Sequence, residues 1–298
     1  MPERSSRGSI AQELDEATEQ LARAGVLNAK REAAALWAAV EGVKPGDVWL
    51  RRDGRPVTPV AAQFWVAVQR RSSGIPFPYA VGRVGFRNLE LKSDARALIP
   101  RPETEGLVEL VIEWAGRGKG EEGRETGGVA ADIGTGCGCI ALALAVEGRF
   151  ERVVAIERSA AAAALARENV ALIAPATPVE VREGDLLTPL ADERCRVIVS
   201  NPPYLTDAEY EALAPAVKAW EPREALASGA DGLEATRALL AGAGALLEPS
   251  GMLALEIDER RGDAVRQLAH EYGWRHLAIH DDIFGRPRYA LAFPGGDA

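Results

Sequence analysis

The sequence predicts an α/β fold in which a small N-terminal helical bundle precedes a doubly wound, mostly parallel sheet. Before about residue 75, apolar residues recur at helical spacing. From residue 103 onward, apolar runs of strand length alternate with helical stretches, which is typical of a parallel sheet covered by helices. The last two strand-like runs, residues 277–280 and 289–293, follow each other without a helix, so we expect a terminal antiparallel strand.

Three predicted helices form the N-terminal bundle. Ser9 and Gln12 fit a capping box, and the apolar residues that follow repeat at helical spacing. Asn28 is expected to cap a second helix over residues 29–41. A third helix is expected over residues 58–71, with a proline in its first turn.

The chain is expected to divide into two domains and a linker. Residues 1–75 make up the helical domain, because a run rich in Ser, Gly and Pro follows and breaks the helical pattern. Residues 76–102 are expected to be a linker with a β-hairpin formed by residues 83–91 and 97–100. Residues 103–298 form the second domain.

The second domain is predicted to alternate strands and helices. Ligands bind at the carboxyl ends of the strands in such sheets, so polar side chains at these ends are the candidates for a site. Residues 116–128, which are rich in glycine and charge, are expected to form a flexible surface loop. Strands are expected from residue 129 and over 153–157, 178–182, 197–200 and 252–257, and helices over 140–146, 233–247 and 263–272.

The composition is that of an ordinary soluble globular protein, with 47% hydrophobic and 27% charged residues. No apolar stretch reaches the roughly 18 residues of a bilayer span, and no secretory signal is evident. We therefore expect a cytoplasmic protein without membrane contact, and we expect a monomer. The formal net charge of −9 would repel phosphates, which argues against a direct nucleic-acid partner.

The cysteines predict neither a disulfide framework nor a metal site. Cys137, Cys139 and Cys195 are an odd number without framework spacing, so reduced thiols are expected. Cys137 and Cys139 could suggest a metal ion, but no second pair of Cys or His lies nearby in the sequence. Packed thiols are the favoured interpretation.

Three glycines at alternate positions, Gly134, Gly136 and Gly138, follow the strand that begins at residue 129. A glycine backbone can pass close to a ligand because no Cβ atom intervenes. The dinucleotide fingerprint G-x-G-x-x-G would need a glycine at Cys139, so a pyrophosphate cradle is the weaker interpretation. The spacing instead favours S-adenosylmethionine.

Residues at the ends of the next two strands fit the rest of such a cofactor. Glu157 ends the second strand about twenty residues after the glycines, where a carboxylate can bind both ribose hydroxyls. Asp185 follows the third strand and can accept from the adenine amino group, while Leu186 can pack on the ring. The alternative for Glu157 is a solvated acid at a strand end.

The tetrapeptide Asn201-Pro202-Pro203-Tyr204 is the most informative motif in the chain. Two consecutive prolines hold the backbone rigid and leave the Pro202 carbonyl unpaired, and the Asn201 side-chain oxygen supplies a second acceptor. Two acceptors can hold both hydrogens of an –NH2 group, and Tyr204 can form a flat wall beside a planar amide or base. A proline-rich turn is the alternative. Together with the glycine motif, these residues indicate a methyltransferase acting on an amide or amino nitrogen.

Several segments carry a resemblance to a known family: Leu98-Ile-Pro-Arg-Pro-Glu-Thr-Glu105, Asp132-Ile-Gly-Thr-Gly-Cys-Gly138, Ser200-Asn-Pro-Pro-Tyr-Leu205, Glu221-Pro-Arg-Glu-Ala-Leu226 and Gly229-Ala-Asp-Gly-Leu233. Over its whole length the sequence resembles the protein-(glutamine-N5) methyltransferases of class I peptide-chain release factors, the HemK/PrmC family. This resemblance implies a class I methyltransferase fold, S-adenosylmethionine as cofactor and S-adenosylhomocysteine as product. It implies methyl transfer to the glutamine amide of the Gly-Gly-Gln motif of a release factor, which residues 1–75 are hypothesised to dock.

The expected site departs from the family pattern in a few places. Glu157 is one methylene longer than the usual Asp, and Leu186 stands where an aromatic residue is frequent, but both keep the physical role. The usual E-I-G-x-x-Q pattern reads Glu256-Ile-Asp-Glu-Arg-Arg261 here. The expected catalytic residues are Asn201, Pro202, Pro203 and Tyr204. The expected cofactor-binding residues are Asp132, Gly134, Thr135, Gly136, Cys137, Gly138, Glu157, Asp185, Leu186 and Asn201.

Three alternatives to this function remain. An adenine-N6 DNA methyltransferase would share the Asn-Pro-Pro-Tyr motif, but it should carry a basic target-reading segment, which the charge balance does not offer. Glutamine methyltransferases that act on a ribosomal protein resemble the chain less around Arg101 to Glu105. A binding module that keeps the fold without catalysis is disfavoured by the intact glycines and Glu157.

Overall fold

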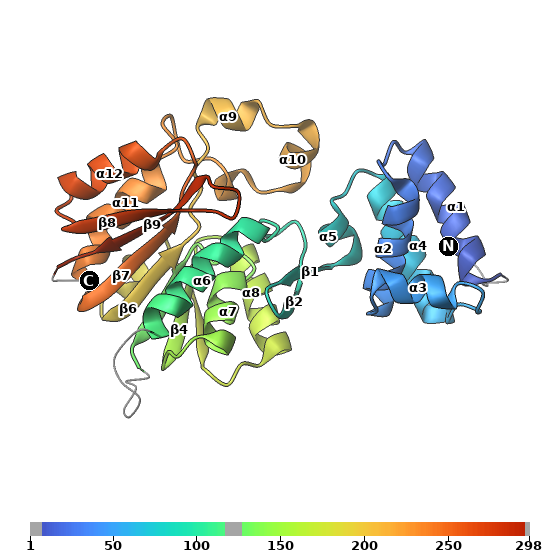
Figure 1. Cartoon of the computed structure of the whole chain (residues 1–298), viewed down its shortest axis with the longest axis horizontal. Helices are drawn as coiled ribbons and strands as arrows, with labels where there is room; N and C mark the ends of the chain where they lie inside the picture. The colour runs from blue at the N-terminus through green and yellow to red at the C-terminus, as the bar shows by residue number, and fades with distance from the viewer. Residues whose placement is uncertain (1–7, 117–126, 296–298) are drawn as a thin grey trace. The chain divides into compact units, whose positions relative to one another are not determined.

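The computed structural model describes residues 8–116 and 127–295, and these form two compact units divided between Arg83 and Val84. We refer to them as the N-terminal unit and the C-terminal unit (Figure 1). The division falls later than the expected end of the helical domain at residue 75. The reason is a short helix, α5 (Phe77–Val81), which packs on the preceding helix and so belongs to the N-terminal unit. Most of the expected glycine-rich loop, residues 117–126, lies outside the described residues.

The N-terminal unit contains the three expected helices and two short ones. Ser9 and Gln12 form the predicted capping box, with the Ser9 backbone N–H donating to Gln12 Oε1 at 2.9 Å. Asn28 stands at the N-cap position of the second helix, as predicted, but its backbone is left-handed (φ 53°) and its side chain makes no capping hydrogen bond. The helices are α1 (Ile10–Arg23), α2 (Ala29–Glu41), α3 (Pro45–Arg51), α4 (Thr58–Ser72) and α5.

Aromatic side chains fill the core of the N-terminal unit. The rings of Trp37 on α2 and Phe64 on α4 lie 4.8 Å apart, and both side chains are buried. Trp65 is partly buried and donates its indole N–H to Glu13 on α1. These contacts join α1, α2 and α4 into one bundle. The helices α3 and α5 were not predicted, because seven and five residues are too short to show a helical period.

The expected hairpin is shorter than the sequence analysis proposed. Strands β1 (Arg83–Phe86) and β2 (Leu89–Lys92) pair in a two-stranded sheet, with Arg87 in a left-handed turn conformation. Residues 97–100, the expected second arm, form no strand. They run instead from the hairpin toward the first helix of the C-terminal unit.

The described part of the C-terminal unit contains a seven-stranded sheet with the order β5-β4-β3-β6-β7-β9-β8. Strands β3 to β7 pair in parallel, whereas β9 is antiparallel to both β7 and β8. This arrangement confirms the predicted doubly wound sheet with a terminal antiparallel strand. The strands are β3 (Val129–Ile133), β4 (Arg152–Glu157), β5 (Val179–Glu183), β6 (Cys195–Ser200), β7 (Leu247–Glu256), β8 (His276–Asp281) and β9 (Pro287–Phe293).

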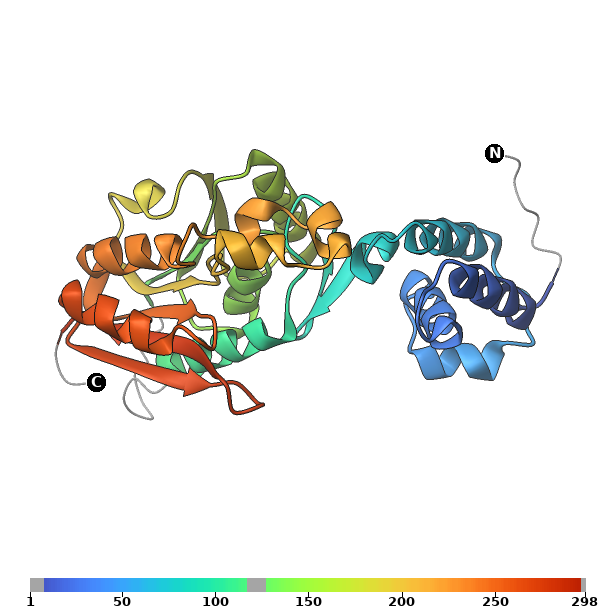
Figure 2. The same ribbon diagram turned by 90° about the horizontal axis from the view of Figure 1, so that it is seen from above.

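Helices cover both faces of this sheet (Figure 2). One core cluster joins the sheet to α6, α7 and α8, and the other joins its opposite face to α11 and α12. In the described residues, no helix combines the length and the apolar character that crossing a bilayer requires. The helices are α6 (Pro102–Gly116), α7 (Cys139–Glu147), α8 (Ala160–Ile173), α9 (Asp207–Glu211), α10 (Pro215–Trp220), α11 (Glu234–Gly242) and α12 (Gly262–Glu271), with 3-10 turns at Thr188–Leu190, Arg223–Ala225 and Ala243–Ala245.

The segment between β6 and α11 carries two helices, α9 and α10, that the sequence analysis did not predict. In Figure 1 these helices stand together, away from the layers that cover the sheet. The segment begins with the Asn-Pro-Pro-Tyr motif, so it forms part of the surroundings of the candidate site.

Candidate active site

A cavity of about 400 Å³ lies in the C-terminal unit, where the carboxyl ends of the parallel strands meet. Its walls come from the loops that follow β3, β4, β5 and β6. Six of the expected cofactor-binding residues line it: Gly134, Gly136, Glu157, Asp185, Leu186 and Asn201.

The glycine loop after β3 has a backbone that other residues adopt only at a cost. Gly134, Gly136 and Gly138 have φ values of 70°, 57° and 88°, in the left-handed region. The N–H groups of Gly134 and Thr135 both donate to the Ile156 carbonyl at 2.9 Å, which fixes the loop against the end of β4. The loop therefore presents bare backbone to the cavity.

Four expected cofactor-binding residues, Asp132 and the loop residues Thr135, Cys137 and Gly138, are buried and do not line the cavity. Asp132 is fully buried, and its Oδ2 accepts from Thr135 Oγ1 at 2.5 Å and from the Ala141 N–H at 3.0 Å. Burial raises the pKa of Asp132 to about 7. Cys137 and Gly138 are also buried, and the Cys137 carbonyl accepts from Asn169 Nδ2 at 2.9 Å. These groups hold the glycine loop in place against α7 and α8.

Glu157 at the end of β4 faces the cavity and is tied to the glycine loop. Its Oε2 accepts from the Gly136 N–H and its Oε1 from the Ser159 N–H, both at 2.9 Å. A carboxylate can accept about four hydrogen bonds, so these two bonds orient the group and leave acceptor positions for a ligand.

Asp185 and Leu186 line the cavity from the loop after β5. Asp185 is exposed and lies 3.9 Å from Arg158 in an ion pair open to solvent. Leu186 has φ of 46°, a left-handed conformation that is costly for a residue with a Cβ atom. This conformation places the leucine side chain at the cavity wall. Nothing in the sequence indicates it.

Asn201 reaches the cavity directly after β6. Its Nδ2 donates to Thr104 Oγ1 at 3.0 Å, and Thr104 Oγ1 donates to Glu256 Oε2 at 2.7 Å. Among the described residues, none donates a hydrogen bond to Asn201 Oδ1 or to the Pro202 carbonyl. Both acceptors that the sequence analysis required are therefore free.

The other members of the motif have different surroundings. Pro203 lines the cavity, and Pro202 is buried. Tyr204 does not line the cavity, and burial with the nearby charge of Glu256 raises its pKa to about 12. The phenol is therefore neutral at physiological pH.

Several cavity residues were missed by sequence reasoning because no local pattern marks them. Arg96 and Ala97 come from the stretch before α6, and the N-cap and first turn of α8 add Ser159 and Ala162. The segment before and within α11 supplies a further wall formed by Pro222, Glu224, Ala225, Ala227, Ser228, Glu234, Ala235 and Ala238. Part of this wall lies in the segment from Glu221 to Leu226, which carries the family resemblance but for which the sequence predicted no role.

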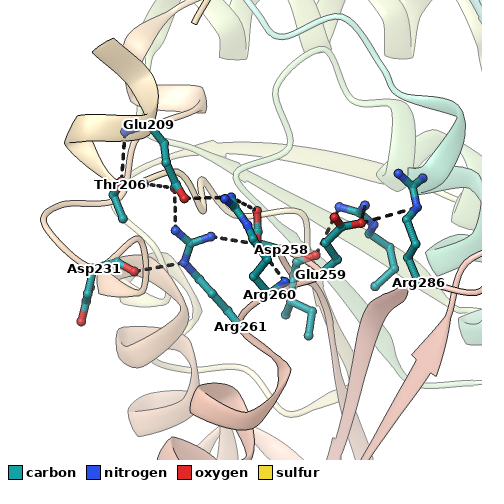
Figure 3. A network of polar contacts seen from close by, with 10 residues as sticks. Thr206, Glu209, Asp231, Asp258, Glu259, Arg260, Arg261 and Arg286 are labelled. Carbon is teal, nitrogen blue, oxygen red and sulfur yellow. Dashed lines mark hydrogen bonds and ion pairs between the residues drawn. The ribbon is translucent and has the colours of Figure 1, made fainter. Parts of the chain in front are cut away.

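An ion network holds the segment that carries α9 against the start of α12 (Figure 3). Arg261, whose side chain is 10% exposed, contacts Glu209 Oε2 at 2.5 Å and Asp258 Oδ1 at 3.0 Å. Its Nε also donates to the Asp231 carbonyl at 3.1 Å. Glu209 accepts in turn from the Thr206 N–H, which closes a capping box on α9. Arg261 thus connects the segment that follows the Asn-Pro-Pro-Tyr motif to the loop at Asp231 and to the residues after β7.

Two family models match the chain, and solved structures share its fold. The methyltransferase small domain matches residues 122–220, and the PrmC N-terminal domain matches residues 12–82. The crystal structure of a methyltransferase from Pyrococcus furiosus aligns with a TM-score of 0.53 at 20% identity, covering 76% of this chain and 99% of that one. The sheet order, the glycine loop and these matches define a class I methyltransferase, a class that uses S-adenosylmethionine.

Sequence relatives narrow this class further. The release factor glutamine methyltransferase of Moorella thermoacetica is 37% identical over 96% of this chain and 98% of its own length. That of Deinococcus radiodurans is 38% identical over 95% of this chain and 98% of its own length. The chain belongs to the family of release factor glutamine methyltransferases.

Proposed function

We propose that this protein transfers a methyl group from S-adenosylmethionine to the side-chain amide nitrogen of the glutamine in the Gly-Gly-Gln motif of class I release factors. The observation that carries the proposal is the pair of free acceptors, Asn201 Oδ1 and the Pro202 carbonyl, beside a cavity with a glycine loop. The names of the sequence relatives supply the substrate.

The cavity has the groups that S-adenosylmethionine requires. Its volume of about 400 Å³ falls within the range of small-molecule sites. Glu157 would bind the ribose hydroxyls, Asp185 the adenine amino group, and Leu186 the adenine ring. Gly134 and Gly136 allow the ligand to approach the backbone closely. When bound, the cofactor supplies an electrophilic methyl group on a sulfonium centre.

The two acceptors address the main difficulty of the reaction. The nitrogen of an amide is a poor nucleophile, because its lone pair is conjugated with the carbonyl. Hydrogen bonds from both N–H groups to Asn201 Oδ1 and the Pro202 carbonyl favour a more pyramidal nitrogen and hold it in place. Positioning and exclusion of water then supply much of the acceleration. The product cation is strongly acidic, so proton loss can follow the transfer.

The two units have different roles in this proposal. All residues that line the cavity belong to the C-terminal unit. Residues 1–75 would therefore bind the protein substrate and take no part in the methyl transfer itself. The net charge of −9 supports a protein substrate over DNA. A release factor as substrate would place the reaction in the cytoplasm.

The proposal is tested by tandem mass spectrometry of a class I release factor after incubation with the protein and S-adenosylmethionine. We expect one added methyl group, located on the glutamine of the Gly-Gly-Gln motif. A reaction without S-adenosylmethionine serves as the control. Methylated adenine in added DNA, with an unmodified factor, would instead support the adenine-N6 alternative. Methylation of a ribosomal protein in preference to the factor would support the third candidate.

The role of Glu157 can be tested by its effect on cofactor binding. Replacing Glu157 by alanine is expected to weaken S-adenosylmethionine binding about tenfold, because the ribose loses a charge-assisted hydrogen-bond partner. Isothermal titration calorimetry measures this change. Glu183→Ala is the matched control, since Glu183 is the β5 residue that pairs in register with Glu157, and its carboxylate forms a half-exposed ion pair with Arg167. Equal affinity of the two variants would remove Glu157 from the site.

A further inference from the structure

Two consecutive side-chain hydrogen bonds connect Asn201 to a buried carboxyl group on the sheet. Thr104 on α6 lies between Asn201 and Glu256, the last residue of β7. Thr104 is 2% exposed and Glu256 is 1% exposed. A carboxyl group in such a place is costly, since desolvation disfavours its charged form. Its only hydrogen-bond donor among the described side chains is the Thr104 hydroxyl.

The donors and acceptors of these two hydrogen bonds determine which way the Asn201 amide points. An ionised Glu256 can only accept, so the single hydrogen of the Thr104 hydroxyl is used in the bond to Glu256. Thr104 Oγ1 then presents only lone pairs to Asn201. A lone pair requires an N–H, so Nδ2 faces Thr104 and Oδ1 faces the opposite way. This orientation follows from hydrogen-bond valence and does not depend on telling oxygen from nitrogen in the amide.

We propose that Thr104 and Glu256 are positioning residues that fix the Asn201 amide with its oxygen toward the substrate, and that they thereby select an –NH2 group over a carboxylate. The inference rests on the proposed function for the identity of the substrate. An Asn201 that could rotate by 180° would present Nδ2 to the substrate half of the time. It would then bind the side chain of glutamate, which has two acceptors and no donor, and would repel the glutamine –NH2.

Protonation of Glu256 would reverse the direction of these two hydrogen bonds. A protonated Glu256 can donate to Thr104, whose hydroxyl hydrogen is then free to point at Asn201 and to favour the rotated amide. Burial raises the pKa of Glu256 to about 7, so the amide orientation that ionised Glu256 imposes holds above about pH 7 and is lost as the pH falls below it. Two nearby arginines favour the carboxylate and one glutamate opposes it. The charged and titratable groups around Glu256 are Arg101, Glu103, Tyr204, Arg288 and Tyr289.

The first test compares Thr104→Val with Thr104→Ser. Valine has the shape of threonine without the hydroxyl, whereas serine keeps it. The probes are a class I release factor and its variant with glutamate in place of the Gly-Gly-Gln glutamine. Wild-type protein and Thr104→Ser are expected to bind the glutamine form more tightly than the glutamate form. In Thr104→Val this preference should fall about tenfold and kcat about tenfold, with S-adenosylmethionine affinity unchanged.

The second test reads the Asn201 amide directly and needs no substrate. The chain has four asparagines, so the side-chain amide signals in an ¹⁵N NMR spectrum can be assigned by substitution. The Asn201 amide signal is expected to shift with a midpoint near pH 7 in the wild type and to show no such step in Glu256→Gln, which cannot ionise. Asn169 is the internal control, because its Nδ2 is buried and donates to the Lys92 and Cys137 carbonyls.

The outcomes separate this inference from the proposed function. A factor that is not methylated by the wild type, together with the expected Asn201 titration, would reject the release-factor substrate and keep the orientation by Thr104 and Glu256. Methylation of the factor with the same kcat and the same glutamine preference in Thr104→Val would overturn the positioning role. An Asn201 signal that titrates identically in the wild type and Glu256→Gln would overturn it as well.

Discussion

Replacing Asn201 by alanine is expected to lower turnover about a hundredfold, with a much smaller effect on S-adenosylmethionine affinity. The amide oxygen of Asn201 accepts from the substrate nitrogen, and this bond strengthens as the nitrogen becomes positively charged in the transition state. Loss of one such preorganised contact costs roughly 10² to 10³ in kcat. The Pro202 carbonyl remains in the variant, so some rate enhancement should persist.

Single-turnover kinetics with a saturating release factor measures this effect. The matched control is Ser200→Ala, because the neighbouring Ser200 is buried and donates its hydroxyl to the Ile133 carbonyl at 2.7 Å instead of facing the cavity. That control should lower stability by about 1 kcal/mol while leaving turnover near the wild-type value. If Asn201→Ala methylates the release factor at the wild-type rate, as the control is expected to do, the two-acceptor mechanism is wrong.

The fold could be predicted because its signals are local. Each strand of the parallel sheet is a short apolar run, and the glycines after the first run leave few alternatives for the backbone. Strand ends were therefore placed within a few residues, and Glu157 and Asn201 were expected where the structure has them. The same local reasoning failed for the hairpin, since residues 97–100 are apolar without pairing in a sheet.

The parts of the site that escaped prediction depend on contacts between distant residues. Thr104 and Glu256 are separated by 152 positions, and neither has a neighbour in the sequence that reveals the bond between them. The wall formed by residues 222–238 likewise faces the glycine loop only after the sheet has formed. Asp132, in contrast, was expected to bind the cofactor but does not line the cavity. Its position at a strand end suggested contact with a ligand, but the structure buries it behind the loop.

The position of Arg261 gives the largest effect expected on stability. Replacing Arg261 by alanine should destabilise the C-terminal unit by about 2 to 3 kcal/mol, because it removes a largely buried cation from two carboxylates and from the Asp231 carbonyl. Arg260 also contacts Glu209 and Asp258, at 2.8 and 2.9 Å, so neither acid is left without a partner. Because Arg260 still pairs with both acids, the expected loss in the free energy of unfolding is smaller than for a buried charge left without any partner.

Urea unfolding, monitored by hydrogen exchange of individual amides, measures this loss of stability and shows which elements it affects. Because the chain divides into two compact units, the exchange of amides in α9 and α12 is used to obtain the free energy of the C-terminal unit, and amides of the N-terminal bundle serve as the internal reference. The control variant is Arg266→Ala on the same helix, whose pair with Asp263 has side chains 54% and 101% exposed. An exposed pair contributes little, so this change should stay below about 0.5 kcal/mol. Equal stability losses in the two variants would show that burial does not distinguish the Arg261 contacts. Selective loss of protection in α9 would show that Arg261 fastens the segment that follows Asn201.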